Sequence, residues 1–206
     1  LPIPFLNLIN GGKHATNNLD FQEYLIVPLT MPTFHEKLAA GRQVFSELGK
    51  ILTDAGHTTQ IGYEGGFAPN LSTNEEGLGL LKQAIEKAGF VPGHDIWLGL
   101  DVAASSLNPT YTPTIDAYID LFEDFPLFSI EDPFTEDDWT HWQLLKEQMS
   151  KLDSSGQPRL LVGDDLFVGN KQRLEEGIKK YVANAQLLKI CQSPTLTDIL
   201  EAINLA

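Results

Sequence analysis

The chain has 206 residues, of which 28 are Asp or Glu and 14 are Lys or Arg, so its formal net charge at pH 7 is −14. This excess of acid argues against nucleic acid and anionic membranes as partners, because both bind basic surfaces. A hydrophobic fraction of 42%, a single cysteine and no apolar run of roughly 18 residues indicate one globular domain over residues 1–206, without an internal disulfide or a membrane span.

The first part of the chain has two strand-like runs, Pro2–Asn10 and Leu19–Pro28, with no helix between them. Neighbouring strands of this kind favour an antiparallel pair. A helix is predicted from about Thr33, because a glutamate three residues later completes the spacing of a capping box. After a glycine-rich loop, Ser72 and Glu75 show the same spacing and predict the start of a second helix.

From residue 96 onward, short apolar runs alternate with amphipathic helices. The predicted strands are Ile96–Leu100, Leu127–Ile130, Leu160–Gly163 and Leu187–Ile190. The predicted helices lie near Ile115–Phe122, Trp139–Met149, Leu174–Val182 and Leu196–Ile203, and a polar connection covers Lys151–Pro158. Continuous apolar strands that alternate with helices are typical of a parallel sheet covered by helices, so the sequence predicts an α/β fold.

Each of these apolar runs carries a charged residue at or near its end. Asp101, Glu131 and Asp164 directly follow the first three runs, and Lys189 lies in the fourth. The intervals between them are 30, 33 and 25 residues, close to the roughly 31 residues per unit of a β/α barrel. Because the C-terminal strand ends of such a barrel converge, we expect these four side chains to meet at one mouth.

Three carboxylates that meet at one point repel one another unless a cation neutralises them. An all-oxygen ligand set favours Mg²⁺, which keeps coordination positions for water and substrate. The sequence therefore predicts a magnesium site formed by Asp101, Glu131 and Asp164. The alternative is that each acid caps the following helix or forms a salt bridge.

Lys189 and Glu64 are candidates for proton transfer. Beside a cation and in a dry site the pKa of Lys189 should fall, which suits a general base. The alternative is a lysine that bridges structural carboxylates. Glu64 lies in the loop Gly62–Gly66, where glycines let the backbone approach a ligand closely, so it is a candidate general acid. The alternative is a solvated loop residue.

Three polar residues after the Gly11–Gly12 turn are within reach of the same mouth: His14, Gln22 and Glu23. Taken alone, they are ordinary polar residues of a loop and a strand. The lone Cys191 has no evident histidine partner, which favours a packing role.

Several stretches together resemble the C-terminal barrel domain of enolase (phosphopyruvate hydratase). They are LPIPFLNLINGGKHATNNLDFQEYLIVP, EGGFAPNL, LGLDVAASS, SIEDPF, LVGDDLF and the strand around LLKICQ, in the family's order. The resemblance implies an enolase-type, TIM-like β/α barrel that begins ββαα. About six of its eight strands are recognisable, so we expect an incomplete barrel, without the N-terminal domain and the last barrel units. We expect the 206 residues alone to show no turnover.

The resemblance also implies roles for individual residues. Asp101, Glu131 and Asp164 would hold the catalytic Mg²⁺. Lys189 would remove the proton next to the carboxylate of 2-phosphoglycerate, and Glu64 would protonate the departing hydroxide to yield phosphoenolpyruvate. The substrate-binding positions would be His14, Gln22, Glu23, Glu131 and Asp164. The complete protein would be a cytoplasmic, homodimeric, Mg²⁺-dependent lyase of glycolysis.

The chain departs from the family pattern next to both proton-transfer candidates. Tyr63 precedes Glu64, where the family usually has Asp. Cys191 and Pro194 follow Lys189, where the family usually has Asn and Gly. These changes motivate an alternative function, in which the protein is a non-catalytic, enolase-like structural or binding element.

Overall fold

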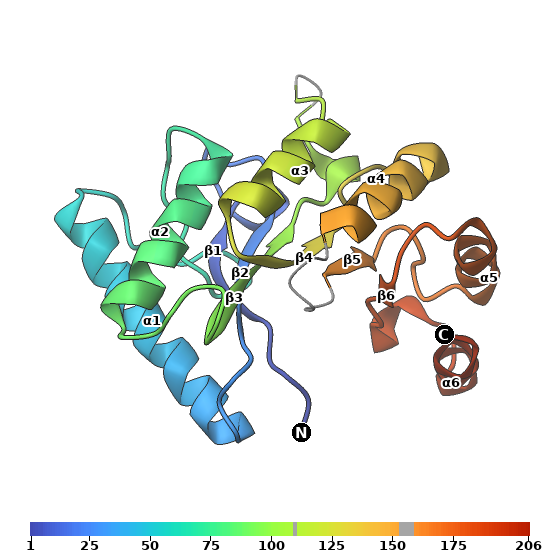
Figure 1. Cartoon of the computed structure of the whole chain (residues 1–206), viewed down its shortest axis with the longest axis horizontal. Coiled ribbons are helices and arrows are strands. Elements are labelled where there is room, and N and C mark those ends of the chain that lie inside the picture. Colours follow the sequence, from blue (N-terminus) through green and yellow to red (C-terminus); the bar gives the residue numbers. More distant parts are fainter. Residues whose placement is uncertain (109–110, 153–158) are drawn as a thin grey trace.

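In a computed structural model of the chain, which describes residues 1–108, 111–152 and 159–206, six strands form one open sheet (Figure 1). The strands follow one another in sequence order: β1 (Leu6–Asn10), β2 (Glu23–Pro28), β3 (Ile96–Asp101), β4 (Leu127–Glu131), β5 (Leu160–Gly163) and β6 (Ala185–Gln186). The pairs β1–β2 and β2–β3 are antiparallel, and the three later pairs are parallel. The predicted antiparallel opening is therefore confirmed.

The helices occur in the predicted order. Two helices separate β2 from β3, and one helix follows each later strand: α1 (Phe34–Asp54), α2 (Asn74–Lys87), α3 (Ile115–Asp124), α4 (Trp139–Leu152), α5 (Lys171–Lys180) and α6 (Leu196–Leu205). In Figure 1 the pairs α1–α2, α3–α4 and α5–α6 succeed one another around the sheet. This ββαα opening followed by βα units gives an α/β fold consistent with the incomplete β/α barrel that the sequence predicts.

The core lies between the sheet and its helices. Ile96, Leu98 and Leu100 of β3 have no exposed surface, and neither do Leu48 of α1 and Leu81 of α2. Continuous apolar burial along a strand occurs where a sheet is covered rather than solvated. Its middle strands are therefore held firmly, which matters because their ends carry acidic side chains.

Local sequence signals explain where the helices begin. Thr33 caps α1 in a full capping box with Glu36, as predicted. The predicted cap of the second helix is wrong by one residue, because Thr73 rather than Ser72 accepts the N–H of Glu76. Residues 153–158 of the predicted polar connection lie outside the described residues. Within the described ranges, no helix is both long enough and apolar enough to cross a membrane.

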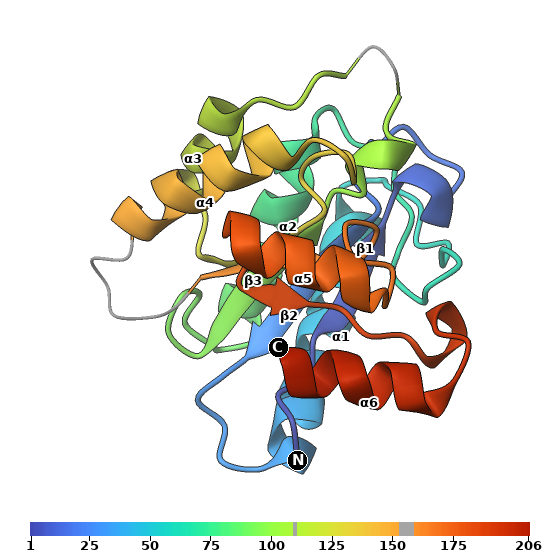
Figure 2. The same ribbon diagram turned by 90° about the vertical axis from the view of Figure 1, so that its right-hand side faces the viewer.

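The last predicted strand is also wrong in position. We expected a strand over Leu187–Ile190, but β6 is the two-residue segment Ala185–Gln186 and a 3₁₀ turn follows at Ile190–Gln192. Only β5 pairs with β6 among the described strands, so no second neighbour extends the ladder. Figure 2 shows the extended connection that runs from the end of β6 to the start of α6.

Candidate active site at the strand ends

The register of the sheet aligns three carboxylates. Glu23 of β2 pairs with Asp101 of β3, and Asp101 pairs with Glu131 of β4. Directly paired residues on neighbouring strands project to the same face of a sheet. The three side chains therefore stand side by side at one edge, although they are far apart in the sequence.

The fourth carboxylate, Asp164, directly follows β5, and its turn is shaped by Asp132. Three consecutive backbone N–H groups donate to the Asp132 carboxylate at 3.1, 2.7 and 3.5 Å: those of Asp164, Asp165 and Leu166. Asp132 has a φ of 40°, in the left-handed region that Asp tolerates better than most residues. Its carboxylate thus builds the turn that carries Asp164.

The acidic side chains are crowded enough to retain protons. Carboxylate oxygens of Glu131, Asp132 and Asp164 lie within 4.8 Å of one another. Burial, reinforced by the charge of Glu23, raises the pKa of Asp101 to about 8. Burial and then the charge of Asp101 raise the pKa of Glu131 to about 9. Burial also raises the pKa of Asp132 to about 7, against the N–H groups that stabilise its charge.

This group of residues fits a hard divalent cation. Its available donors are oxygens, the ligands that Mg²⁺ prefers. Oδ1 of Asp101 is buried and accepts no hydrogen bond from the described residues, and a buried carboxylate oxygen without a partner is unfavourable. A cation would supply that partner and relieve the repulsion that raises the pKa of Glu131.

Lys189 reaches the acidic group from the loop after β6. Its Nζ lies 2.5 Å from Oδ2 of Asp164, and Nε2 of Gln192 donates to Oδ1 of the same carboxylate at 2.6 Å. The expected position inside a dry, apolar strand is wrong, because the Lys189 side chain is 46% exposed and follows the end of β6. Cys191, for which packing was favoured, is exposed.

The protein's own groups act on the pKa of Lys189 in opposite directions, and the fall expected beside a bound cation stays a prediction. Burial lowers this pKa, but the hydrogen bond and the charge of Asp164 outweigh burial, and Glu131 and Asp101 act in the same direction. The net pKa is therefore raised. The Asp164 carboxylate therefore holds Lys189 as an ammonium group.

Polar residues from the N-terminal segment surround the carboxylates. Nδ1 of His14 lies 3.1 Å from Oε1 of Glu23, and Nε2 of Gln22 donates to Oδ2 of Asp101 at 3.3 Å. Burial, opposed by His14 and supported by the charge of Glu64, raises the pKa of Glu23. The Gly11–Gly12 turn thus brings a histidine and an amide to the acidic edge of β2 and β3.

Glu64 is held at the tip of a tight glycine loop. The N–H of Gly62 donates to the carbonyl of Gly66 at 2.7 Å, and the N–H of Tyr63 donates to the carbonyl of His14 at 2.8 Å. A side chain at Gly66 would meet the backbone of β1 at 2.8 Å, so only glycine allows this approach. Glu64 is exposed and faces the same cavity as His14.

One cavity of about 670 Å³ collects every residue that sequence reasoning singled out as a site residue. They come from four strand ends and three loops: His14, Gln22, Glu23, Glu64, Asp101, Glu131, Asp164 and Lys189. A volume of this size accommodates a small organic anion together with a cation. The arrangement combines an acidic cation site, a lysine and a second carboxylic acid across one concave space.

Sequence reasoning missed two residues of this region. Asp132 follows Glu131 directly and belongs to the tightest acidic group, but no spacing rule distinguishes it from Glu131. Gln192 is the third residue after Lys189, and one turn of 3₁₀ helix brings both side chains to Asp164. The sequence predicts a strand over Leu187–Ile190, and that prediction does not place Gln192 beside Asp164.

Comparison with known protein families identifies one match over the chain. The family described as enolase, C-terminal TIM barrel domain, matches residues 1–112 and 108–206 in two overlapping segments. Together the two segments span the strands, the helices and every residue that lines the cavity.

Proposed function

We propose that this chain, which belongs to the family of enolase C-terminal TIM barrel domains, carries the site of an Mg²⁺-dependent dehydration of 2-phosphoglycerate to phosphoenolpyruvate in the complete protein. The observation that supports this proposal is the cavity that collects all eight candidate residues. By analogy with the family, we also propose that the complete protein is a cytoplasmic homodimer.

In this proposal Asp101, Glu131 and Asp164 hold the cation. Asp132 is committed to three backbone N–H groups and shapes the turn instead. A divalent cation bound by these carboxylates would offset the negative charge that raises the pKa of Lys189 and would stabilise negative charge that develops on the substrate carboxylate.

Lys189 and Glu64 divide the proton transfers. Lys189 accepts the proton from the carbon next to the substrate carboxylate once its ammonium group has lost a proton. Glu64 donates a proton to the departing hydroxyl group, so that water leaves and the double bond forms. His14, Gln22 and Glu23 line the cavity between these groups and orient the substrate.

Turnover by the intact protein tests the proposal. We expect the enol product to appear from 2-phosphoglycerate only when Mg²⁺ is present. Lys189→Met should lower kcat by about 10²–10⁴-fold, the usual contribution of a general base. Lys171→Met is the matched control, because Lys171 pairs with Glu201 at 3.0 Å on the exposed surface. Equal activity of the Lys189→Met variant and the wild type would overturn the assigned base.

A second candidate function is that of a non-catalytic, enolase-like binding protein. Both oxygens of Asp164 already accept hydrogen bonds, one from Lys189 and one from Gln192. A cation must compete with these donors. Tight binding of Mg²⁺ and of a substrate analogue by the intact protein would argue against the second candidate, and loss of both would favour it.

A further inference from the structure

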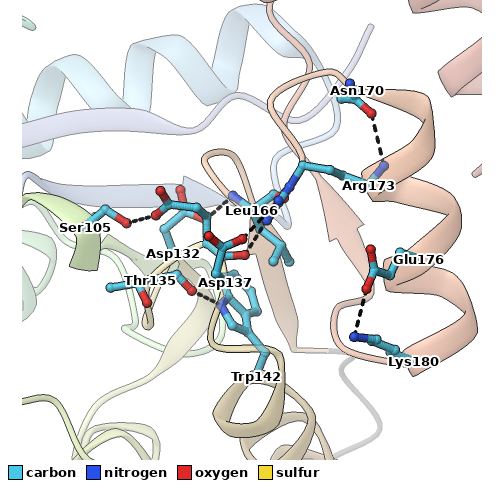
Figure 3. Close-up of polar contacts among 11 residues, drawn as sticks. Ser105, Asp132, Thr135, Asp137, Trp142, Leu166, Asn170, Arg173, Glu176 and Lys180 are labelled. Carbon is cyan, nitrogen blue, oxygen red and sulfur yellow. Dashed lines mark hydrogen bonds and ion pairs between the residues drawn. The ribbon is translucent and has the colours of Figure 1, made fainter.

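Arg173 of α5 connects the outer sides of two loops that carry the acidic residues. Its Nε donates to the carbonyl of Leu166, in the loop after β5, at 2.6 Å. One terminal nitrogen donates to the backbone carbonyl of Glu136, in the loop after β4, and the other lies 3.1 Å from Oδ1 of Asp137. Figure 3 shows the guanidinium group between the two loops.

The same connection extends to a third loop. The Ser105 hydroxyl, which follows β3, donates to the Glu136 carboxylate. On the inner side, the backbone N–H of Ala104 donates to the carbonyl of Asp132 at 2.9 Å. Hydrogen bonds therefore connect the loop after β4 to the loops after β3 and β5. Arg173 supplies the connection between the loops after β4 and β5 on the outer side.

We propose that Arg173 is a positioning residue of the carboxylate site, which sets the separation between Glu131 and Asp164 by fixing the loops after β4 and β5. This inference rests on the proposed function, because it takes these two carboxylates as cation ligands. The guanidinium group does not line the cavity, so its effect on the site passes through the backbone of the two loops.

The chemistry of the contacts requires arginine. The planar guanidinium group has five N–H donors in a rigid arrangement, and here donors in three directions meet two backbone carbonyls and one carboxylate. The guanidinium carbon lies over the ring of Trp139, 5.1 Å from the ring centroid, which adds a cation–π contact. A lysine ammonium group has three donors on one nitrogen and lacks the rigid fork with which three separate nitrogens of Arg173 reach these acceptors.

The chain contains a matched control for this residue. Lys180, on the same helix, lies 4.8 Å from the centre of the same Trp139 ring and pairs with Glu176 at 2.8 Å. It donates to neither loop. Figure 3 shows Lys180 paired with Glu176, apart from the contacts of Arg173. Lys180→Ala therefore removes a cation from the same ring and the same helix and leaves the hydrogen bonds between the two loops intact.

The test measures cation binding to the intact protein. Mn²⁺ is the probe, because it prefers the same oxygen ligands as Mg²⁺ and its free form is quantified by electron paramagnetic resonance. We expect Arg173→Lys to raise the Kd for Mn²⁺ about 10-fold and Arg173→Ala to raise it further, up to about 100-fold, the usual range for residues that orient metal ligands. Lys180→Ala should leave the Kd within about twofold of the wild type.

The outcomes separate this inference from the proposed function. Circular dichroism must show the same folded spectrum for Arg173→Lys and Lys180→Ala, so that a change in Kd reports on the site. An unchanged Kd in both Arg173 variants, with Mn²⁺ binding to the wild type, would overturn the positioning role alone. Absence of Mn²⁺ binding to the wild type would overturn the proposed function and this inference together.

Discussion

The middle and the C-terminal end of the sheet support the site in different ways. Strand β3 has six residues and neighbours on both sides, whereas β6 has two residues and pairs only with β5 among the described strands. Helix α1 buries a full apolar face, but α6 buries only Ala202. Leu196, Leu200 and Ile203 of α6 remain more than half exposed.

The acidic residues and the candidate base are therefore held in place by different kinds of contact. Asp101 and Glu131 are aligned by direct strand pairing, so backbone hydrogen bonds of the sheet hold them. Lys189 lies beyond the last strand, and the side chain of Asp164 holds its amine. The acids are therefore preorganised by the fold, while the base is positioned by a contact that a bound cation would weaken.

The largest expected effect is a contrast in stability between the two regions. Leu48 of α1 is fully buried, whereas Leu200 of α6 is 59% exposed. Leu48→Ala should lower the free energy of unfolding by about 2–5 kcal/mol, because it leaves a cavity in a packed core. Leu200→Ala should change it by less than about 0.5 kcal/mol. Urea unfolding of the two variants measures both values, and equal losses would remove the contrast.

The next effect is a dependence of stability on pH. The pKa values of Asp101 and Glu131 are about 8 and about 9 in the folded protein, against usual values of 3.8 and 4.5. Over this window the folded state keeps protons that the unfolded state has released, so the stability present at low pH is lost as pH rises. In a chelating buffer the free energy of unfolding should fall by several kcal/mol from about pH 5 to about pH 9, because each carboxyl group that stays protonated only in the folded state contributes up to about 1.4 kcal/mol per pH unit.

Two comparisons test whether Asp101 and Glu131 cause this fall of the free energy of unfolding with pH. The double variant Asp101→Asn, Glu131→Gln should have a clearly shallower profile, because neither amide titrates, while Asp132 and Glu23 still do. Saturating Mg²⁺ should flatten the wild-type profile as well, since a cation favours the ionised carboxylates. A wild-type profile without slope in the chelating buffer would contradict the raised pKa values.

A smaller effect concerns the turn between β5 and α5. Asp132→Ala removes the acceptor of three N–H groups and should lower the free energy of unfolding by about 1–3 kcal/mol. Asp132→Asn keeps one acceptor oxygen, which can serve the N–H groups of Asp164 and Leu166, and Asn tolerates the same left-handed backbone, but its NH₂ group cannot accept from Asp165. We therefore expect Asp132→Asn to lose less stability than Asp132→Ala in thermal unfolding, and an equal loss would show that the retained acceptor contributes nothing.

The smallest effect compares two helix starts with the same chemistry. Thr33 and Thr195 both form capping boxes, at α1 and α6. Thr33→Ala should lower the free energy of global unfolding by about 1 kcal/mol. Thr195→Ala should change mainly the local opening of α6, because that helix is weakly buried. Hydrogen exchange resolves the two helices, and equal protection losses would show that α6 unfolds with the core.

Much of the fold is predictable from local patterns. The capping box at Thr33, the apolar strands and the helical faces each depend on residues a few positions apart, and the structure places these elements where the patterns predict them, except for the last strand. The spacing of Asp101, Glu131 and Asp164 is a pattern of the same kind, because a βα unit has a nearly constant length. It predicts the convergence that the cavity shows, while the chemical roles of the three residues stay predictions.

The contacts that complete the site join residues far apart in the sequence and are not predictable from local patterns. Arg173 meets the carbonyl of Glu136 across 37 positions in the sequence, and Lys189 meets Asp164 across 25. No periodicity encodes such pairs, because they depend on how far each loop reaches after its strand ends. Periodicity along the chain was enough to predict which strand ends carry acids, whereas packing in three dimensions decided which donors hold them.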